Sequence, residues 1–117
     1  MNIPEQLKIQ KDFSQVGQSV WLDSISRDML LSNSLKNLIE KLGVRGLTSN
    51  PTIFEQAITG SDSYDESIKI LSKKTNSAEE LSYFLMTEDI QRACDLFAEV
   101  YKKTGGLDGY ASIEIPP

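Results

Sequence analysis

Carboxylate, amide and hydroxyl side chains follow the apolar runs of this 117-residue sequence, and they could transfer protons or bind a polar ligand. Asp23 closes one run of β-forming residues, and Glu114 lies in another. Thr48 and Asn50 stand just before Pro51. Two carboxylates in different environments can act as general acid and general base. An amide and a hydroxyl beside them would position a substrate through hydrogen bonds.

The composition excludes several other kinds of site and partner. There is no histidine, so a Ser-His-Asp triad or a histidine-ligated metal cannot be built from this sequence. The single cysteine, Cys94, excludes an intramolecular disulfide and a cysteine-based zinc site. The net charge is −5 and basic residues cluster only as lysine pairs, so no nucleic-acid partner is expected.

Hydropathy and length indicate one domain in the cytoplasm. No apolar run approaches the ~20 residues of a membrane span, so no membrane association is expected. The first residues lack the apolar core of a signal peptide. At this length the chain is expected to form at most one domain.

Three short strands separated by helices must position the candidate side chains. Residues 19–23, 46–49 and 110–115 are predicted as strands from their β-forming residues and flanking turn signals. A helix that ends at Gly43 separates the first two strands, which makes a βαβ unit with parallel strands. The apolar face of this helix comprises Leu35, Leu38, Ile39 and Leu42.

A longer helical region is predicted between the second and third strands. Pro51 opens its first helix, which extends to residue 58 and ends at Gly60. Ser63 and Glu66 have the spacing of a capping box and predict a second helix through Leu71.

Two further helix starts are predicted before the third strand. Ser77 and Glu80 again have capping-box spacing, and Thr87, followed by two acidic residues, predicts a fresh start. The last helix ends at Gly105 and Gly106. Its predicted apolar stripe comprises Ile90, Ala93, Cys94, Phe97 and Tyr101.

Alternation along the strands brings the candidate residues to one face of the sheet, since successive side chains point to opposite sides. Ala111 and Ile113 are expected to face the helices, which leaves Glu114 on the inner face. The same parity places Asp23 and Asn50 on that face. All three lie at carboxyl ends of strands, where parallel α/β folds bind ligands.

Each candidate also has a simpler structural interpretation. Asn50 is an ideal N-cap for the next helix, and taken alone it fits capping and ligand binding about equally. Asp23 taken alone fits a cap of the following turn better. Glu114 is hardest to explain structurally, because inward charge is costly unless it is paired or functional, although at a chain end it would be exposed. Cys94 is expected to be a small core residue.

Several segments together resemble the transaldolase family. The second strand–helix junction of that family resembles Thr48-Ser49-Asn50-Pro51. Its first strand resembles Ser19-Val20-Trp21-Leu22-Asp23-Ser24-Ile25, and its third resembles Gly105-Gly106-Leu107-Asp108-Gly109-Tyr110-Ala111-Ser112-Ile113-Glu114. Residues 60–65 and 88–95 match in the same order, so the resemblance covers residues 17–114.

The resemblance implies the N-terminal part of a (β/α)8 TIM barrel, with its site at the carboxyl face. Residues 1–117 would be a single partial-barrel domain that is not closed in this chain. Within it, residues 1–18 would form an arm, and residues 19–117 the first three strands and their connecting helices. The implied reaction transfers a dihydroxyacetone unit from sedoheptulose 7-phosphate to glyceraldehyde 3-phosphate in the pentose phosphate pathway. It proceeds through a lysine Schiff base and uses no metal or organic cofactor.

The same resemblance implies a role for each candidate. Asp23 corresponds to the carboxylate that takes and returns the proton of the substrate hydroxyl. Glu114 corresponds to the carboxylate that works with a water molecule in forming and hydrolysing the Schiff base. Asn50 corresponds to an amide that binds the substrate, with Thr48 lining the same pocket.

The sequence departs from the family in lacking the Schiff-base lysine. The family carries that lysine on its fourth strand, and no lysine of this sequence falls in a predicted strand. The isolated chain is therefore expected to be inactive, as a truncated enzyme fragment. Two alternatives remain: a non-catalytic module that oligomerises or binds sugar phosphates weakly, and a chain that completes a barrel with a separately encoded remainder. Three strands leave two open sheet edges, which favours self-association or association with the missing barrel half.

Overall fold

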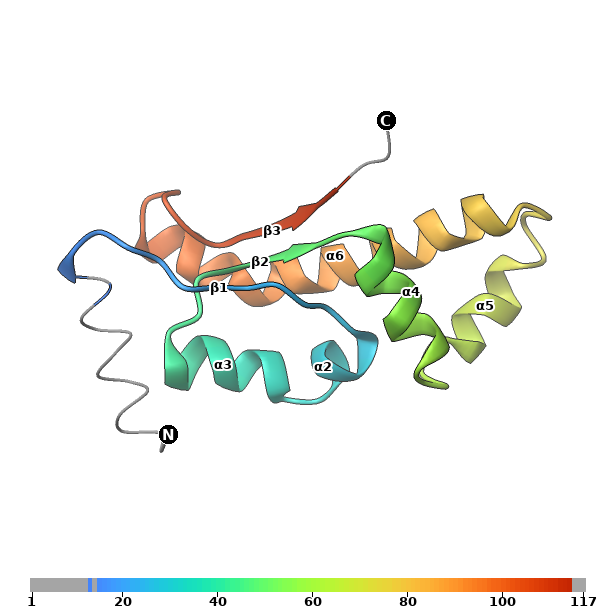
Figure 1. Ribbon diagram of the computed structural model, residues 1–117, viewed down its shortest axis with the longest axis horizontal. Helices are drawn as coiled ribbons and strands as arrows, with labels where there is room; N and C mark the ends of the chain where they lie inside the picture. Colours follow the sequence, from blue (N-terminus) through green and yellow to red (C-terminus); the bar gives the residue numbers. More distant parts are fainter. Residues whose placement is uncertain (1–12, 14, 115–117) are drawn as a thin grey trace.

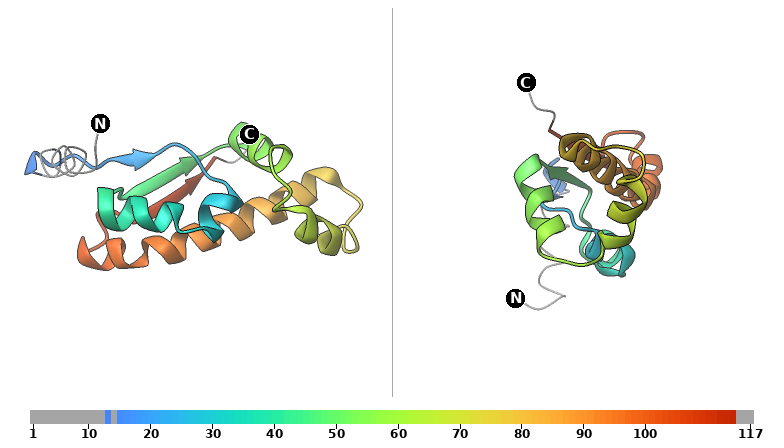
Figure 2. Two further views of the ribbon diagram at one scale, coloured as in Figure 1. Left: turned by 90° about the horizontal axis from the view of Figure 1, so that it is seen from below. Right: turned by 90° about the vertical axis from the view of Figure 1, so that its right-hand side faces the viewer.

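The computed structural model describes residue 13 and residues 15–114 as an open sheet with helices packed on one side (Figure 1, Figure 2). Three parallel strands lie in the order β1-β2-β3, which makes β1 and β3 the edges of the described sheet. This is a partial α/β barrel, as predicted. The strands are β1 (Trp21–Leu22), β2 (Gly46–Ser49) and β3 (Tyr110–Ile113). The helices are α2 (Arg27–Leu31), α3 (Ser34–Leu42), α4 (Pro51–Thr59), α5 (Asp65–Leu71) and α6 (Ala78–Lys103).

Some predictions fall on residues that the structure does not describe. Most of the arm expected over residues 1–18 and the end of the third strand at residue 115 lie outside the described part of the chain. The first strand is shorter than predicted, with two paired residues. No helix within the described residues is both long enough and apolar enough to cross a membrane.

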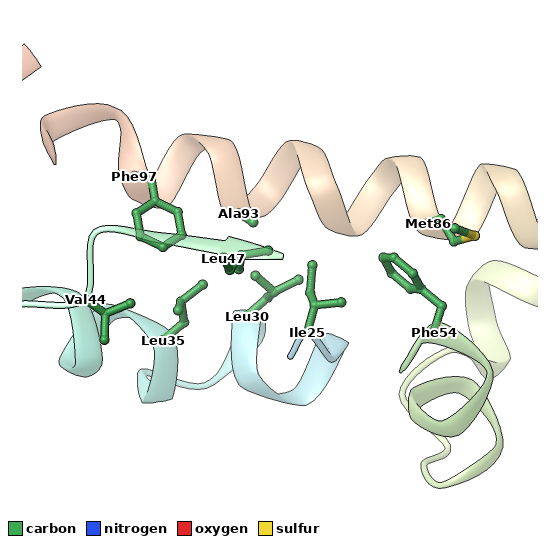
Figure 3. Close-up of a cluster of buried hydrophobic side chains, with 9 residues drawn as sticks. All are labelled: Ile25, Leu30, Leu35, Val44, Leu47, Phe54, Met86, Ala93 and Phe97. Carbon is green, nitrogen blue, oxygen red and sulfur yellow. The ribbon is translucent and has the colours of Figure 1, made fainter. Parts of the chain in front are cut away.

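The hydrophobic core lies between the sheet and its helices (Figure 3). Leu47 from the central strand is fully buried there, and Leu22, Ala111 and Ile113 pack against the same cluster. The predicted alternation is therefore confirmed, because these residues share the helix side of their strands. The buried cluster comprises Ile25, Leu30, Leu35, Val44, Leu47, Phe54, Met86, Ala93 and Phe97.

The local signals for the end of α3, the bounds of α4 and the start of α6 are confirmed. Gly43 follows α3 with a left-handed backbone (φ 71°), a conformation that costs glycine little because it has no Cβ. Pro51 begins α4, which ends before Gly60. Ser77 caps α6 by accepting a hydrogen bond from the backbone N–H of Glu80 at 3.2 Å.

The predicted capping box at Ser63 is wrong. Helix α5 begins two residues later, and Tyr64 is its N-cap residue, with no side-chain cap hydrogen bond. The Ser63 hydroxyl donates instead to the Asp28 carboxylate on α2, and the Ser63 backbone N–H donates to the Ser61 hydroxyl. A contact with a distant helix has replaced the local cap.

The predicted helix start at Thr87 is also wrong, because α6 continues unbroken through it. The Thr87 hydroxyl donates to the Tyr83 carbonyl one turn earlier, at 2.8 Å. The two acidic residues that suggested a start serve another purpose. Glu88 and Asp89 lie 3.5 Å and 2.9 Å from the guanidinium of Arg27.

The apolar stripe predicted for α6 is only partly correct. Ala93 and Phe97 are fully buried, whereas Cys94 is exposed and Tyr101 is 48% exposed. Successive helical residues are rotated by about 100°, so the residue after Ala93 points away from the sheet. Cys94 is therefore a surface residue and not the small core residue that was expected.

A polar cluster joins the amino ends of the strands. Asp108, which is buried, accepts hydrogen bonds from Ser19 at 2.9 Å and from Arg45 at 3.2 Å. Next to it, the Gly109 backbone N–H donates to the Arg45 carbonyl at 2.8 Å. Gly109 has a φ of 95°, and a Cβ there would lie 2.5 Å from the backbone nitrogen of Tyr101. Only glycine fits this close approach of β3 to α6.

Candidate functional site

Asp23 and Thr48 meet on the inner face of the sheet, the side opposite the helices. The Thr48 hydroxyl donates to Oδ1 of Asp23 at 2.6 Å. Each residue comes directly after a leucine of the paired strands, since Leu22 aligns with Leu47 and both face the core. Asp23 is exposed and Thr48 is half-buried, so the carboxylate is accessible from the inner side.

The simpler interpretation of Asp23 as a helix cap does not describe the structure. Helix α2 is capped by Ser26, whose hydroxyl accepts from the backbone N–H of Met29 at 3.2 Å. The Asp23 carboxylate is thus not used by the helix that follows it. It remains available for a ligand while Thr48 holds one of its oxygens.

Asn50 does act as a helix cap. Its Oδ1 accepts a hydrogen bond from the backbone N–H of Ile53 at 2.9 Å, which satisfies one free donor of the first turn of α4. The cap uses only the oxygen of the amide. Its Nδ2 group, a donor, is left for other contacts, so capping and ligand binding are compatible in one side chain.

Glu114 continues the sheet beyond β3. Its backbone N–H donates to the Ser49 carbonyl at 3.2 Å, and its side chain is exposed. Ser112 aligns with Thr48 in the register of the two strands, and Glu114 is two residues further along the same face. The structure therefore places Asp23, Thr48 and Glu114 on the inner face at the carboxyl ends of adjacent strands.

An aromatic layer lies beneath these polar groups and was not anticipated from the sequence. Trp21, Gly46 and Tyr110 align across the strands, and the two rings stack with centroids 6.5 Å apart. A Cβ on Gly46 would lie 2.5 Å from the Trp21 ring, so the indole occupies the space above this glycine. The alignment of Gly46 between two aromatic residues depends on the register of the three strands, which was not predicted from the sequence.

Two grooves of the described residues lie on the helix side, away from the candidate residues. A groove of about 530 Å³ separates α3 from α6, and another of about 370 Å³ separates α4 from α6. Asp23, Thr48, Asn50 and Glu114 line neither. The candidate residues therefore belong to neither of these two grooves.

The described lysines do not approach the inner face of the sheet. Each of them is exposed and belongs to a helix or to the turn after α5; they are Lys36, Lys41, Lys69, Lys73, Lys74, Lys102 and Lys103. A Schiff-base lysine needs a desolvated or cation-flanked environment that lowers its pKa, and an exposed helix surface supplies neither. The described residues also contain no cluster of three acidic, histidine or cysteine side chains that could hold a metal ion.

A buried polar cluster behind the site was missed by the sequence interpretation. Arg27, Tyr64 and Asp89 are at most 2% exposed. Asp89 accepts from Arg27 Nε at 2.9 Å and from the Tyr64 hydroxyl at 2.6 Å. Burial and the hydrogen bond to Asp89 raise the pKa of Tyr64 well above its ordinary value, so this hydroxyl remains a donor. The sequence held one signal of this cluster. Asp89 stands three residues after Met86 and four before Ala93, so a carboxylate shares their buried face of the helix.

Comparison with known proteins assigns the family. Residues 20–117 match the sequence profile of the Transaldolase/Fructose-6-phosphate aldolase family. The chain belongs to this family. The match covers every strand of the described sheet and all four candidate site residues, so the resemblance inferred from the sequence is confirmed.

Individual relatives agree with that assignment. The chain is 48% identical over 106 residues to the transaldolase of Trichodesmium erythraeum, covering 91% of this chain and 28% of that protein. It is 42% identical over 106 residues to transaldolase 2 of Nostoc punctiforme, covering 91% of the chain and 28% of that protein. It is 40% identical over 111 residues to the transaldolase of Thiobacillus denitrificans, covering 95% of the chain and 31% of that protein. The chain thus spans less than a third of the length of these family members.

Proposed function

We propose that this chain supplies the proton-transfer and substrate-binding part of a transaldolase active site. The proposed reaction moves a dihydroxyacetone unit from sedoheptulose 7-phosphate to glyceraldehyde 3-phosphate through a lysine Schiff base, in the pentose phosphate pathway of the cytoplasm. The Asp23–Thr48 pair on the inner face, at the carboxyl ends of β1 and β2, is the observation that supports this assignment. The lysine would come from a strand outside this chain.

In the proposed mechanism each residue acts through an atom that the fold leaves accessible. The Asp23 carboxylate takes the proton of the substrate hydroxyl as the carbon–carbon bond breaks and returns it to the acceptor. Thr48 orients that carboxylate through its 2.6 Å hydrogen bond. The Asn50 Nδ2 group binds the substrate, and Glu114 works with a water molecule during formation and hydrolysis of the Schiff base.

The function can be tested in a chimera that supplies the rest of a barrel. In it, this segment replaces the 106 matched residues of the Trichodesmium erythraeum transaldolase. We expect the purified chimera to convert sedoheptulose 7-phosphate and glyceraldehyde 3-phosphate to erythrose 4-phosphate and fructose 6-phosphate. A folded chimera without this activity would contradict the proposal.

The 117-residue chain alone should form no Schiff base with fructose 6-phosphate, because its described lysines are exposed on helices and a turn. Borohydride reduces a Schiff base to a stable adduct that mass spectrometry locates. We expect no substrate adduct on the isolated chain under conditions that label the chimera. A specific adduct at one lysine of the isolated chain would show that it carries its own nucleophile.

A second candidate function is a non-catalytic module that associates through its sheet. The described sheet has open edges at β1 and β3, and Tyr110 is exposed on the inner face beside the half-buried Trp21. Open edges and exposed aromatic surface favour association. Sedimentation velocity should therefore show oligomers of the isolated chain at micromolar concentration. A monomer with a sharp cooperative unfolding transition would argue against this module.

A further inference from the structure

The segment that carries Asp23 is held at both ends. On one side Leu22 pairs with Leu47 in the sheet, immediately before Asp23. On the other side, four residues after Asp23, the Arg27 backbone N–H donates to the Tyr64 hydroxyl at 2.8 Å. The segment between these two anchors is only residues 23–26, so movement of either anchor changes the position of the carboxylate.

The second anchor is itself fixed inside the protein. The Tyr64 hydroxyl accepts from Arg27 and donates to Asp89 at 2.6 Å, so it links the start of α2 to the middle of α6. The Arg27 side chain binds the same carboxylate, lies over the Tyr64 ring at 4.5 Å and donates to Ser67 at 2.7 Å. Because a buried group with several satisfied hydrogen bonds is costly to displace, this cluster allows little freedom.

We propose that Tyr64, Arg27 and Asp89 are positioning residues. They keep the Asp23 carboxylate hydrogen-bonded to Thr48 and within reach of the substrate hydroxyl. All three are at most 2% exposed, and the Tyr64 hydroxyl is engaged with both Arg27 and Asp89. They act through the backbone of residues 23–26. This inference rests on the proposed catalytic role of Asp23 and adds residues far from the reacting atoms to that site.

The test is Tyr64→Phe in the chimera, a change that removes one oxygen and keeps the buried ring. A small displacement of a catalytic group can cost up to about 100-fold in rate, so we expect kcat to fall about 10- to 100-fold. The KM should change less than about twofold, because the substrate-binding groups Asn50 and Thr48 are not attached to this anchor. If Tyr64→Phe does not fold, Asp89→Asn serves instead and should give the same loss.

The matched control is Asp108→Asn, which weakens a buried polar cluster at the opposite, amino end of the sheet. It should lower the melting temperature and leave kcat within about twofold. In the 117-residue chain, amide hydrogen exchange of residues 22–30 should quicken in Tyr64→Phe and stay unchanged in Asp108→Asn. This second measurement needs no activity.

The outcomes separate this inference from the proposed function. Normal kcat in Asp23→Asn, or an inactive chimera, would contradict the proposed function. Loss of kcat in Asp23→Asn with normal kcat in Tyr64→Phe and Asp89→Asn would overturn the positioning role alone. Equal kcat loss in Asp108→Asn, or unchanged exchange in Tyr64→Phe, would also overturn it.

Discussion

Asp23→Asn is expected to lower the kcat of the chimera by about 10²- to 10⁴-fold, the usual cost of losing a positioned general acid–base group. The asparagine keeps the shape of the side chain and an oxygen that can accept from Thr48, so the fold should survive. It cannot take a proton from the substrate hydroxyl. The measurement is steady-state kinetics with sedoheptulose 7-phosphate and glyceraldehyde 3-phosphate, alongside thermal melting of the same samples.

The control for this variant is Asp28→Asn, the same chemical change five residues along the chain. Asp28 is exposed on α2 and accepts from the Ser63 hydroxyl, away from the inner face. We expect its kcat to stay within about twofold of the parent. Near-normal kcat in Asp23→Asn, or loss of its fold, would mean that Asp23 is a structural residue and not the proton-transfer group.

Asp89→Ala is expected to destabilise the chain by about 3 kcal/mol, because it removes the shorter of the two ion pairs that compensate the buried Arg27 charge and leaves only Glu88, 3.5 Å away. Arg27 would keep Ser67 as a hydrogen-bond partner but lose its carboxylate 2.9 Å away. The Tyr64 hydroxyl would lose its acceptor at the same time. Total stabilities of about 5–15 kcal/mol are usual, so this single change would remove a large fraction of the free energy of unfolding.

Urea denaturation followed by circular dichroism measures this effect, at equal protein concentration for each variant. Asp95→Ala is the control, since Asp95 is an exposed aspartate on the same helix. The free energy of unfolding of this control should change by no more than about 0.5 kcal/mol. A similarly small change for Asp89→Ala would show that water or Glu88 compensates the charge of Arg27 without Asp89.

Several helices and strands could be predicted from short-range sequence signals, because these signals do not depend on residues far away in the sequence. Gly43 ends α3 and Pro51 begins α4 because backbone geometry restricts which residues fit those positions. Strand β2 and the placement of Asp23 and Glu114 on one face followed from apolar alternation, since burial of one face sets the parity of every side chain. These signals also supported the family resemblance that the comparisons confirmed.

The errors occurred where a distant residue competed with a local interaction. Ser63 bonds to Asp28 on another helix, and so does not cap α5. Glu88 and Asp89 pair with Arg27 and not with helix N–H groups, so α6 passes through Thr87 without interruption. A local pattern cannot show which of two possible hydrogen-bond partners a side chain will choose.

The short-range pattern of this sequence is enough to predict an open parallel α/β sheet, its inner face and the residues at the carboxyl ends of its strands. The hydrogen bond between Asp23 and Thr48 and the cluster behind it depend on three-dimensional packing. Arg27 lies 37 residues from Tyr64 and 62 from Asp89 in sequence, and no local rule connects them. They meet because α5 and α6 fold back over the start of α2, where a charge excluded from water must find its partner.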